Sequence, residues 1–290
     1  SYDKKITDEY LDAYYIKGED GKALSVVKPG DSIIFINFRA DRAIQLTRAF
    51  EDTEFPGWDR VIIPDLYFVG FSNYEKGFPK KQAFPPERIT NPFGKVISDN
   101  GLRQLRIAES EKYPHVTYFF NGGNQTQYPG EDHIEVPSPR EVATYDLKPE
   151  MSAYELTDVL INKLEENIYD VIVLNFANAD MVAHTGVIEA TIKALEVADE
   201  CVGKIYRAIK DKGGAMILTS DHGNAEEMID LQTGNIDTKH STNPVPLLIL
   251  KDGLESRELP FGILADVVPT ALAMLGITKP VEMTGRDLMV

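Results

Sequence analysis

Short apolar runs alternate with segments of helical periodicity along this chain, and no other feature of the sequence limits the fold so strictly. The apolar runs predict buried strands at residues 33–38, 116–120, 171–174, 215–219 and 247–250. Helices are predicted at residues 40–50, 152–166, 188–209 and 263–275. A capping-box pair, Ser152 and Glu155, indicates the start of the second helix, and glycines follow the last two. Strands that alternate with helices are typical of the α/β class.

Two adjacent prolines, Pro85 and Pro86, mark the best candidate for a domain boundary. Proline donates no backbone hydrogen bond to a sheet and stiffens the chain. We therefore predict a partial domain at residues 1–85 and a nearly complete α/β domain at residues 86–290.

The formal net charge of −16 makes nucleic acids and acidic membranes poor partners for the molecule as a whole. The single cysteine, Cys201, excludes an internal disulfide and a cysteine-rich zinc site. The sequence contains no run of 18 apolar residues and does not open with a basic segment followed by an apolar one. We therefore expect no membrane span, no secretory signal and a cytoplasmic location.

Three polar clusters carry histidine or aspartate at places where α/β folds position ligand sites, beyond the carboxyl ends of strands. In the first, Asp180 and His184 are four residues apart and share one face of a helical turn. In the second, Asp221 and His222 directly follow the strand predicted at residues 215–219. The third, around His240, precedes Pro244 and another predicted strand.

Each cluster alone also fits a plain structural role. Asp180 could cap a helix beside a solvated His184, Asp221 and His222 could belong to an ordinary polar turn, and His240 could be a loop residue. Together they offer two carboxylates and three imidazoles without a thiolate, a set that suits Mn²⁺ or Zn²⁺. Two such ions form the usual clamp for displacement at phosphorus. His115 and His133 have no acidic partner at ligand spacing, so we interpret both as structural.

Three segments of the sequence, NADMVAHTG at residues 178–186, TSDHGNAE at 219–226 and HSTNPVP at 240–246, closely resemble cofactor-independent phosphoglycerate mutases. This family belongs to the alkaline phosphatase-like superfamily. The segments NFRADR at 37–42 and EKYPHVT at 111–117 agree with it. The resemblance runs along the whole chain but covers only a little over half of a typical family member, its C-terminal portion.

The resemblance implies a phosphatase-like α/β domain, with a mainly parallel sheet flanked by helices, at residues 86–290. Residues 1–85 would then be the C-terminal part of an inserted α/β transferase domain. It also implies two divalent ions, for which we expect Mn²⁺, with Zn²⁺ or Co²⁺ as alternatives. One ion would be held by Asp180, His184 and His240. The other would be held by Asp221 and His222, together with an aspartate and a serine from an upstream segment.

The family interconverts 3-phosphoglycerate and 2-phosphoglycerate in glycolysis and gluconeogenesis, without 2,3-bisphosphoglycerate. Its upstream serine is the nucleophile and becomes a phosphoserine. By resemblance, Arg39 and Arg42 would bind the substrate's phosphate and Lys112 would neutralise the transferring phosphoryl group. Without the resemblance, a salt-bridged helix start with Asp41 and a solvated lysine would be the preferred interpretations.

Because the nucleophile lies upstream of Ser1 in the family, we expect this chain alone to be inactive as a mutase. We also expect a monomer that acts on small molecules and does not bind nucleic acid or membranes. Two alternatives stay open. One is another phosphohydrolase or phosphopentomutase of the same superfamily, and the other is a non-catalytic metal-binding fragment.

Overall fold

The computed structural model describes residues 13–38, 40–75, 77–85, 89–254 and 258–290. The chain divides into two compact units, Ser1–Arg88 and Ile89–Val290. The division falls three residues beyond the boundary that the two prolines predict. None of the helices in the described ranges combines the length and apolar character that a membrane crossing needs.

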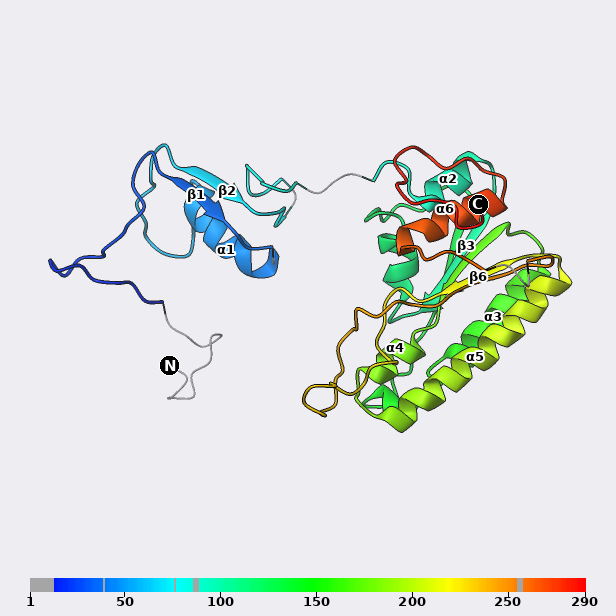
Figure 1. The fold of residues 1–290 in the computed structure, drawn as a ribbon. Helices are drawn as coiled ribbons and strands as arrows, with labels where there is room; N and C mark the ends of the chain where they lie inside the picture. The colour runs from blue at the N-terminus through cyan, green and yellow to red at the C-terminus, as the bar shows by residue number, and fades with distance from the viewer. Residues whose placement is uncertain (1–12, 39, 76, 86–88, 255–257) are drawn as a thin grey trace. The chain divides into compact units, whose positions relative to one another are not determined.

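In its described residues, the first unit contains a two-stranded parallel sheet and helix α1 (Figure 1). Strand β1 (Ser32–Phe35) pairs with β2 (Tyr67–Gly70), and helix α1 (Ala40–Glu51) carries the buried side chains of Ala43 and Thr47. Phe68 is the buried centre of the unit's aromatic cluster, and it packs against Phe35 and Phe50. The helix predicted at residues 40–50 is confirmed, whereas the strand predicted at 33–38 is shorter.

The second unit is built on a parallel three-stranded sheet with β3 at its centre. The order is β4 (Glu131–Val136), β3 (Gln104–Glu109) and β5 (Val171–Asn175), and every residue of β3 is buried. A separate antiparallel pair joins β6 (Met216–Thr219) to β7 (Leu247–Leu250). The α/β class with a mainly parallel sheet is therefore confirmed.

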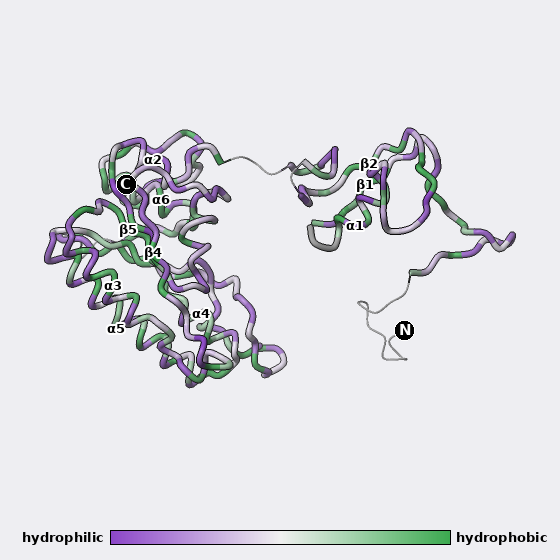
Figure 2. Tube along the Cα trace, turned by 180° about the vertical axis from the view of Figure 1, so that it is seen from behind, coloured by the Kyte–Doolittle hydropathy of each residue, from purple (hydrophilic) through white to green (hydrophobic). Residues whose placement is uncertain are grey.

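Helices cover both faces of the larger sheet (Figure 1). Helices α3 (Ala153–Glu165) and α5 (Ile188–Asp211) contribute Leu156, Leu160 and Ile205 to a core with Leu105 and Ile107 of β3. On the other face, α2 (Phe93–Asp99) and α6 (Val267–Met274) pack against Val171 and Val173 of β5. Hydrophobic and hydrophilic residues alternate with the helical turn along α3 and α5, as expected for helices with one buried side (Figure 2).

Two predictions of local structure were wrong. Residues 116–120 were predicted as a strand, but His115–Phe119 forms a π-helical turn, because the backbone continues from a turn in which the His115 amide donates to the Lys112 carbonyl. The capping box of α3 does not form either. The Ser152 hydroxyl donates to the Pro137 carbonyl, and the Ser152 amide donates to the Glu109 carboxylate at 3.1 Å.

Glu109, the last residue of β3, therefore ties the centre of the sheet to the start of α3. Its second oxygen accepts a hydrogen bond from the Ser138 hydroxyl at 3.2 Å. Burial raises the pKa of this carboxyl group to about 7, although the hydrogen bonds from Ser152 and Ser138 act in the opposite direction. The folded protein thus holds a proton on Glu109 under conditions in which an unfolded chain releases it.

This raised pKa predicts a stability that falls as the pH rises. The contribution of Glu109 is fully present below a pH of about 4.5 and is lost as the pH approaches the folded-state pKa of about 7. We expect the fall between pH 5 and pH 8 to be about 2 kcal/mol smaller in Glu109→Gln than in the parent chain. Urea unfolding at both pH values measures this difference, and equal slopes in the two proteins would contradict the prediction.

Candidate metal centre

Asp180 and His184 come to one face through a short helix at the carboxyl end of β5. Two residues separate the end of β5 from the start of helix α4 (Asn178–Ala183), and His184 is the residue that caps the helix at its C-terminus. The four-residue spacing places the Asp180 Oδ1 atom 3.3 Å from the His184 Nε2 atom. The shared face predicted from the sequence is therefore present.

His240 joins this pair from the segment before β7. Its Nε2 atom lies 3.3 Å from Asp180 Oδ1 and 3.1 Å from His184 Nε2. The segment is held in place by a backbone hydrogen bond of 2.9 Å from the Ser241 amide to the Gly223 carbonyl, in the turn after β6. One atom from each of Asp180, His184 and His240 thus lies within 4.8 Å of the others, a group that could hold a metal ion.

The donor atoms fit a divalent ion. Two ligand atoms that are each about 2.1 Å from one ion lie about 3.0–3.4 Å apart at right-angled to tetrahedral geometry. The three separations in this group are 3.1, 3.3 and 3.3 Å. The Nδ1 atom of His184 lies 2.7 Å from the Thr238 carbonyl oxygen, which can only accept a hydrogen bond. Nδ1 therefore carries the proton, and Nε2 presents a lone pair to its neighbours.

Two further side chains fix the Asp180 carboxylate. The Lys112 ammonium group donates to Oδ2 at 2.6 Å, and the Asn224 amide donates to Oδ1 at 2.7 Å. Burial alone would raise the pKa of Asp180, but these hydrogen bonds outweigh it and lower the pKa, so the carboxylate stays ionised. No local pattern in the sequence indicates this role for Asn224, although it lies in the same motif as Asp221.

Asp221 and His222 lie beside this group. The ring of His222 stacks on that of His240 with centroids 3.7 Å apart, and its Nδ1 atom is 4.0 Å from Asp180 Oδ1. The carboxylate of Asp221 lies 3.7 Å from His222 Nε2 and is 44% exposed. Four of the five ligands proposed from the sequence therefore lie together near the carboxyl ends of β5 and β6, and Asp221 adjoins them through His222.

The structure describes Lys112 fully but does not describe the side chains of the two proposed arginines. Lys112 is almost fully buried against Asp180, so its ammonium group belongs to the centre. Arg39 lies outside the described residues, and only the backbone of Arg42 is described, in the first turn of α1. The two arginines therefore stay a prediction.

The two histidines interpreted as structural have different surroundings. His133 Nε2 lies 2.5 Å from the buried carboxylate of Glu131 in the sheet. His115 lies close enough to the candidate centre to respond to its charges. Burial and the positive charge of Lys112 lower the pKa of His115, and the carboxylates of Asp221 and Asp180 oppose this effect. The sequence does not indicate that His115 lies near the candidate centre, because its segment was expected to form a strand and instead forms a π-helical turn.

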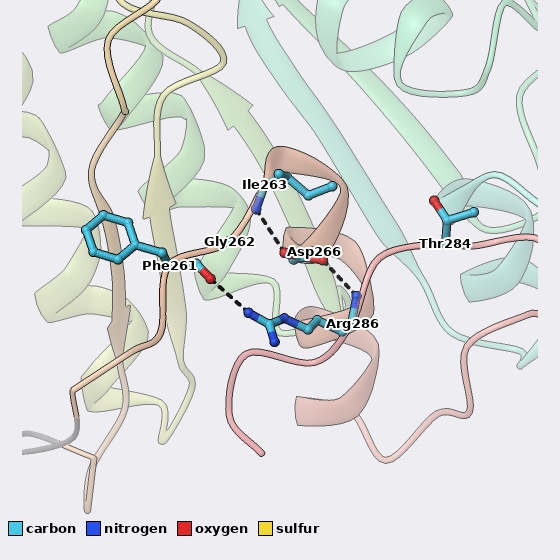
Figure 3. Close-up of a pocket in the computed structure, with 6 residues that line it drawn as sticks. All are labelled: Phe261, Gly262, Ile263, Asp266, Thr284 and Arg286. Atoms are coloured by element: carbon cyan, nitrogen blue, oxygen red, sulfur yellow. Dashed lines mark hydrogen bonds between the residues drawn. The ribbon is translucent and has the colours of Figure 1, made fainter.

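A separate surface pocket contains none of these residues (Figure 3). Its polar groups bond to one another. The Asp266 carboxylate accepts hydrogen bonds from the backbone amides of Ile263 and Arg286 at 2.9 and 2.7 Å. The Arg286 side chain donates to the Phe261 carbonyl at 2.9 Å. These bonds connect the chain after α6 to the segment before it, so the polar groups of the pocket stabilise the fold.

Fold and site together define an α/β protein with a cluster of side chains that could hold a metal ion, at the carboxyl ends of its strands. The chain belongs to the Metalloenzyme superfamily, whose model matches residues 32–279. Divalent-metal use is a property of this family, and in this chain the group of Asp180, His184 and His240 could hold such an ion.

Comparison with individual proteins confirms the resemblance found in the motifs. A 2,3-bisphosphoglycerate-independent phosphoglycerate mutase of Clostridium beijerinckii is 51% identical over 100% of this chain and 56% of that protein. One from Methanosarcina acetivorans is 49% identical with the same coverage. The crystal structure of Leishmania mexicana phosphoglycerate mutase at low cobalt concentration superposes with a TM-score of 0.66 and 34% identity, over 99% of this chain and 55% of that one. The chain thus spans a little over half the length of these relatives and corresponds to their C-terminal portion.

Proposed function

We propose that this chain provides the metal-binding part of a cofactor-independent phosphoglycerate mutase, which interconverts 3-phosphoglycerate and 2-phosphoglycerate. The observation that carries the proposal is the convergence of Asp180, His184 and His240 in a chain that aligns over its full length with such enzymes. We further propose Mn²⁺ as the metal and a cytoplasmic location, in keeping with a role in glycolysis.

In this proposal Asp180, His184 and His240 hold one divalent ion, and Asp221 and His222 contribute to a second. Bound ions would supply positive charge to a transferring phosphoryl group. Thr238 and Asn224 orient the ligands, which reduces the rearrangement needed when charge develops. Lys112, fixed by Asp180 at 2.6 Å, adds a point charge at the same place. Arg39 and Arg42 would bind the substrate's phosphate from the first unit, which would then be a substrate-binding domain.

Phosphoryl transfer needs positioning and charge stabilisation and little covalent work from the protein, apart from the nucleophile. The resemblance assigns the nucleophilic serine to residues outside these 290. We therefore expect no mutase turnover from this chain alone in 3-phosphoglycerate with Mn²⁺. Turnover should appear when the chain is co-expressed with the unmatched N-terminal part of the Clostridium beijerinckii enzyme.

The test is an assay for 2-phosphoglycerate in three samples: the chain, the N-terminal part and the two together. A Mn²⁺-dependent product in the third sample alone would support the proposal. Hydrolysis of 3-phosphoglycerate to glycerate and phosphate would instead indicate a phosphohydrolase. An inactive mixture in which both parts are folded and associated would contradict the proposed function.

A further inference from the structure

The long segment between β6 and β7 carries three of the five proposed ligands. Asp221 and His222 follow β6, and His240 precedes β7. Figure 1 shows this segment extending beyond the two strands, beside α4. Its two ends meet in an isolated antiparallel bridge between Gly223 and Ser241. The contacts around this bridge therefore decide where His240 lies.

The carboxylate of Glu226 connects the two ends of this segment. Its Oε2 atom accepts a hydrogen bond from the Asn224 backbone amide at 2.8 Å. Its Oε1 atom accepts hydrogen bonds from the Ser241 hydroxyl and from the Asn243 side-chain amide, the latter at 3.1 Å. Burial alone would raise the pKa of Glu226, but these hydrogen bonds outweigh it and lower the pKa, so the carboxylate is an ionised acceptor. One side chain thus bonds to residues of both ends.

The packing around this carboxylate is close. A Cβ atom on residue 223 would overlap with the Ser241 hydroxyl and the Glu226 carboxylate, so the contact requires Gly223. The Ser241 amide donates to the Gly223 carbonyl at 2.9 Å, and the Ser241 hydroxyl accepts from the Asn243 amide at 3.2 Å. Backbone and side-chain bonds together therefore fix the turn that follows His240.

Both partners of Glu226 lead directly to the candidate metal centre. Asn224, whose backbone Glu226 holds, donates from its side chain to Asp180 Oδ1 at 2.7 Å. Ser241, whose hydroxyl Glu226 holds, directly follows His240. The Nε2 atom of His240 lies 3.3 Å from the same oxygen of Asp180. Loss of the Glu226 carboxylate would thus release an orienting group and a ligand at the same time.

We infer that Glu226 is a positioning residue of the candidate metal centre, which sets the affinity for the first ion by holding His240 and Asn224 against Asp180. Glu226 is not one of the three residues whose donor atoms converge, so it acts through its partners. Side chains that orient metal ligands typically change the metal affinity by about 10–100-fold when they are mutated. The choice of Mn²⁺ as the ion rests on the proposed function, whereas the position of Glu226 rests on its hydrogen bonds.

Calorimetric titration of Mn²⁺ into the whole chain tests the inference. Glu226→Ala is expected to bind Mn²⁺ at least about tenfold more weakly than the parent chain. Glu227→Ala is the matched control, because it removes the same charge one residue away, from a carboxylate that contacts the Asn243 side chain at 2.6 Å. Its affinity should stay within about threefold of the parent at 0.15 M salt or above, where exposed charges are screened. Equal losses in both variants, or no loss in Glu226→Ala, would overturn the inference.

Ser241→Ala separates the hydrogen bond from the charge. This variant keeps every carboxylate and removes the hydroxyl that Glu226 accepts from, so we expect the Mn²⁺ affinity to fall by at least about threefold. The double variant Glu226→Ala/Ser241→Ala should bind no more weakly than Glu226→Ala, because both changes break the same contact. Additive losses would show that Glu226 acts by its charge alone and would overturn the inference.

Nuclear magnetic resonance of the metal-free chain gives a readout that needs neither metal nor turnover. The rings of His222 and His240 stack with centroids 3.7 Å apart, so their protons should show mutual Overhauser cross-peaks. These cross-peaks should be present in the parent chain and in Glu227→Ala and absent from a folded Glu226→Ala variant. Their persistence in Glu226→Ala would show that His240 keeps its place without this carboxylate, which would overturn the inference.

The mutase assay on the co-expressed pair separates this inference from the proposed function. Absence of turnover, together with the expected difference in Mn²⁺ affinity between the parent chain and Glu226→Ala, would contradict the proposed function and support the positioning role. Turnover by the parent pair, together with equal Mn²⁺ affinities of the parent chain and Glu226→Ala, would contradict the positioning role alone.

Discussion

Asp180→Ala is expected to lower the affinity of this chain for Mn²⁺ by at least about 100-fold, equivalent to about 2.7 kcal/mol. The Oδ1 atom of Asp180 is the one donor that lies 3.3 Å from both His184 Nε2 and His240 Nε2. Its removal also leaves the Lys112 ammonium group without the carboxylate that it contacts at 2.6 Å. An uncompensated positive charge beside two imidazoles opposes the binding of a cation.

Calorimetric titration of Mn²⁺ into the parent chain and the variant measures this effect. Asp199→Ala is the matched control, since it removes an exposed carboxylate from α5 and should leave the affinity unchanged. Circular dichroism of each variant shows whether the fold is retained. Equal affinities for the parent chain and a folded Asp180→Ala variant would contradict the assignment of this carboxylate as a ligand.

Glu131→Ala is expected to destabilise the second unit by about 3–5 kcal/mol, because it leaves a buried guanidinium without its counter-charge. The side chains of Arg106 and Glu131 are both 0% exposed, with 3.9 Å between Arg106 Nε and Glu131 Oε1. Arg106 also donates to Gln104 at 2.6 Å and lies over the ring of Phe120. Burial lowers the pKa of Arg106 to about 10, because a buried charge is unfavourable, and the carboxylate of Glu131 opposes this effect.

Urea unfolding of the variant gives the change in the free energy of unfolding. Glu196→Ala, which breaks an exposed ion pair with Lys193 on α5, should cost less than about 1 kcal/mol. The double variant Arg106→Met/Glu131→Ala should be more stable than Glu131→Ala, because the unpaired charge is gone. A loss of under 1 kcal/mol in Glu131→Ala would show that the buried pair does not stabilise the fold.

Apolar patterns in the sequence predicted several of the strands and helices, although the apolar run at residues 116–120 does not form a strand. Helix α5, for example, ends close to the predicted place, where the backbone reaches a φ of 71° at Gly213, a conformation that glycine adopts without strain. The sequence was not sufficient for β3, the central strand, because its six residues include Gln104, Arg106 and Glu109. Arg106 donates to Gln104 on the same strand, Gln104 donates to the Gly94 carbonyl, and Glu109 accepts from the Ser152 amide. No local pattern in the sequence indicates these partners.

The candidate centre likewise combines features that the sequence predicts with features that it does not. Asp180 and His184 could be paired from their spacing, because a helical turn fixes their relative positions. His240 could be added from composition and family resemblance alone, because its approach depends on the contact between Ser241 and Gly223. The hydrogen bonds from Asn224 and to Thr238 follow from the path of two loops, and single-sequence reasoning has no access to that path.

The most direct test is the anomalous diffraction of manganese in crystals of this chain grown with Mn²⁺. We expect a peak bonded to Asp180 Oδ1, His184 Nε2 and His240 Nε2, at about 2.0–2.3 Å from each atom. The absence of a peak among these three side chains at saturating Mn²⁺ would contradict the assignment of this cluster as the metal centre.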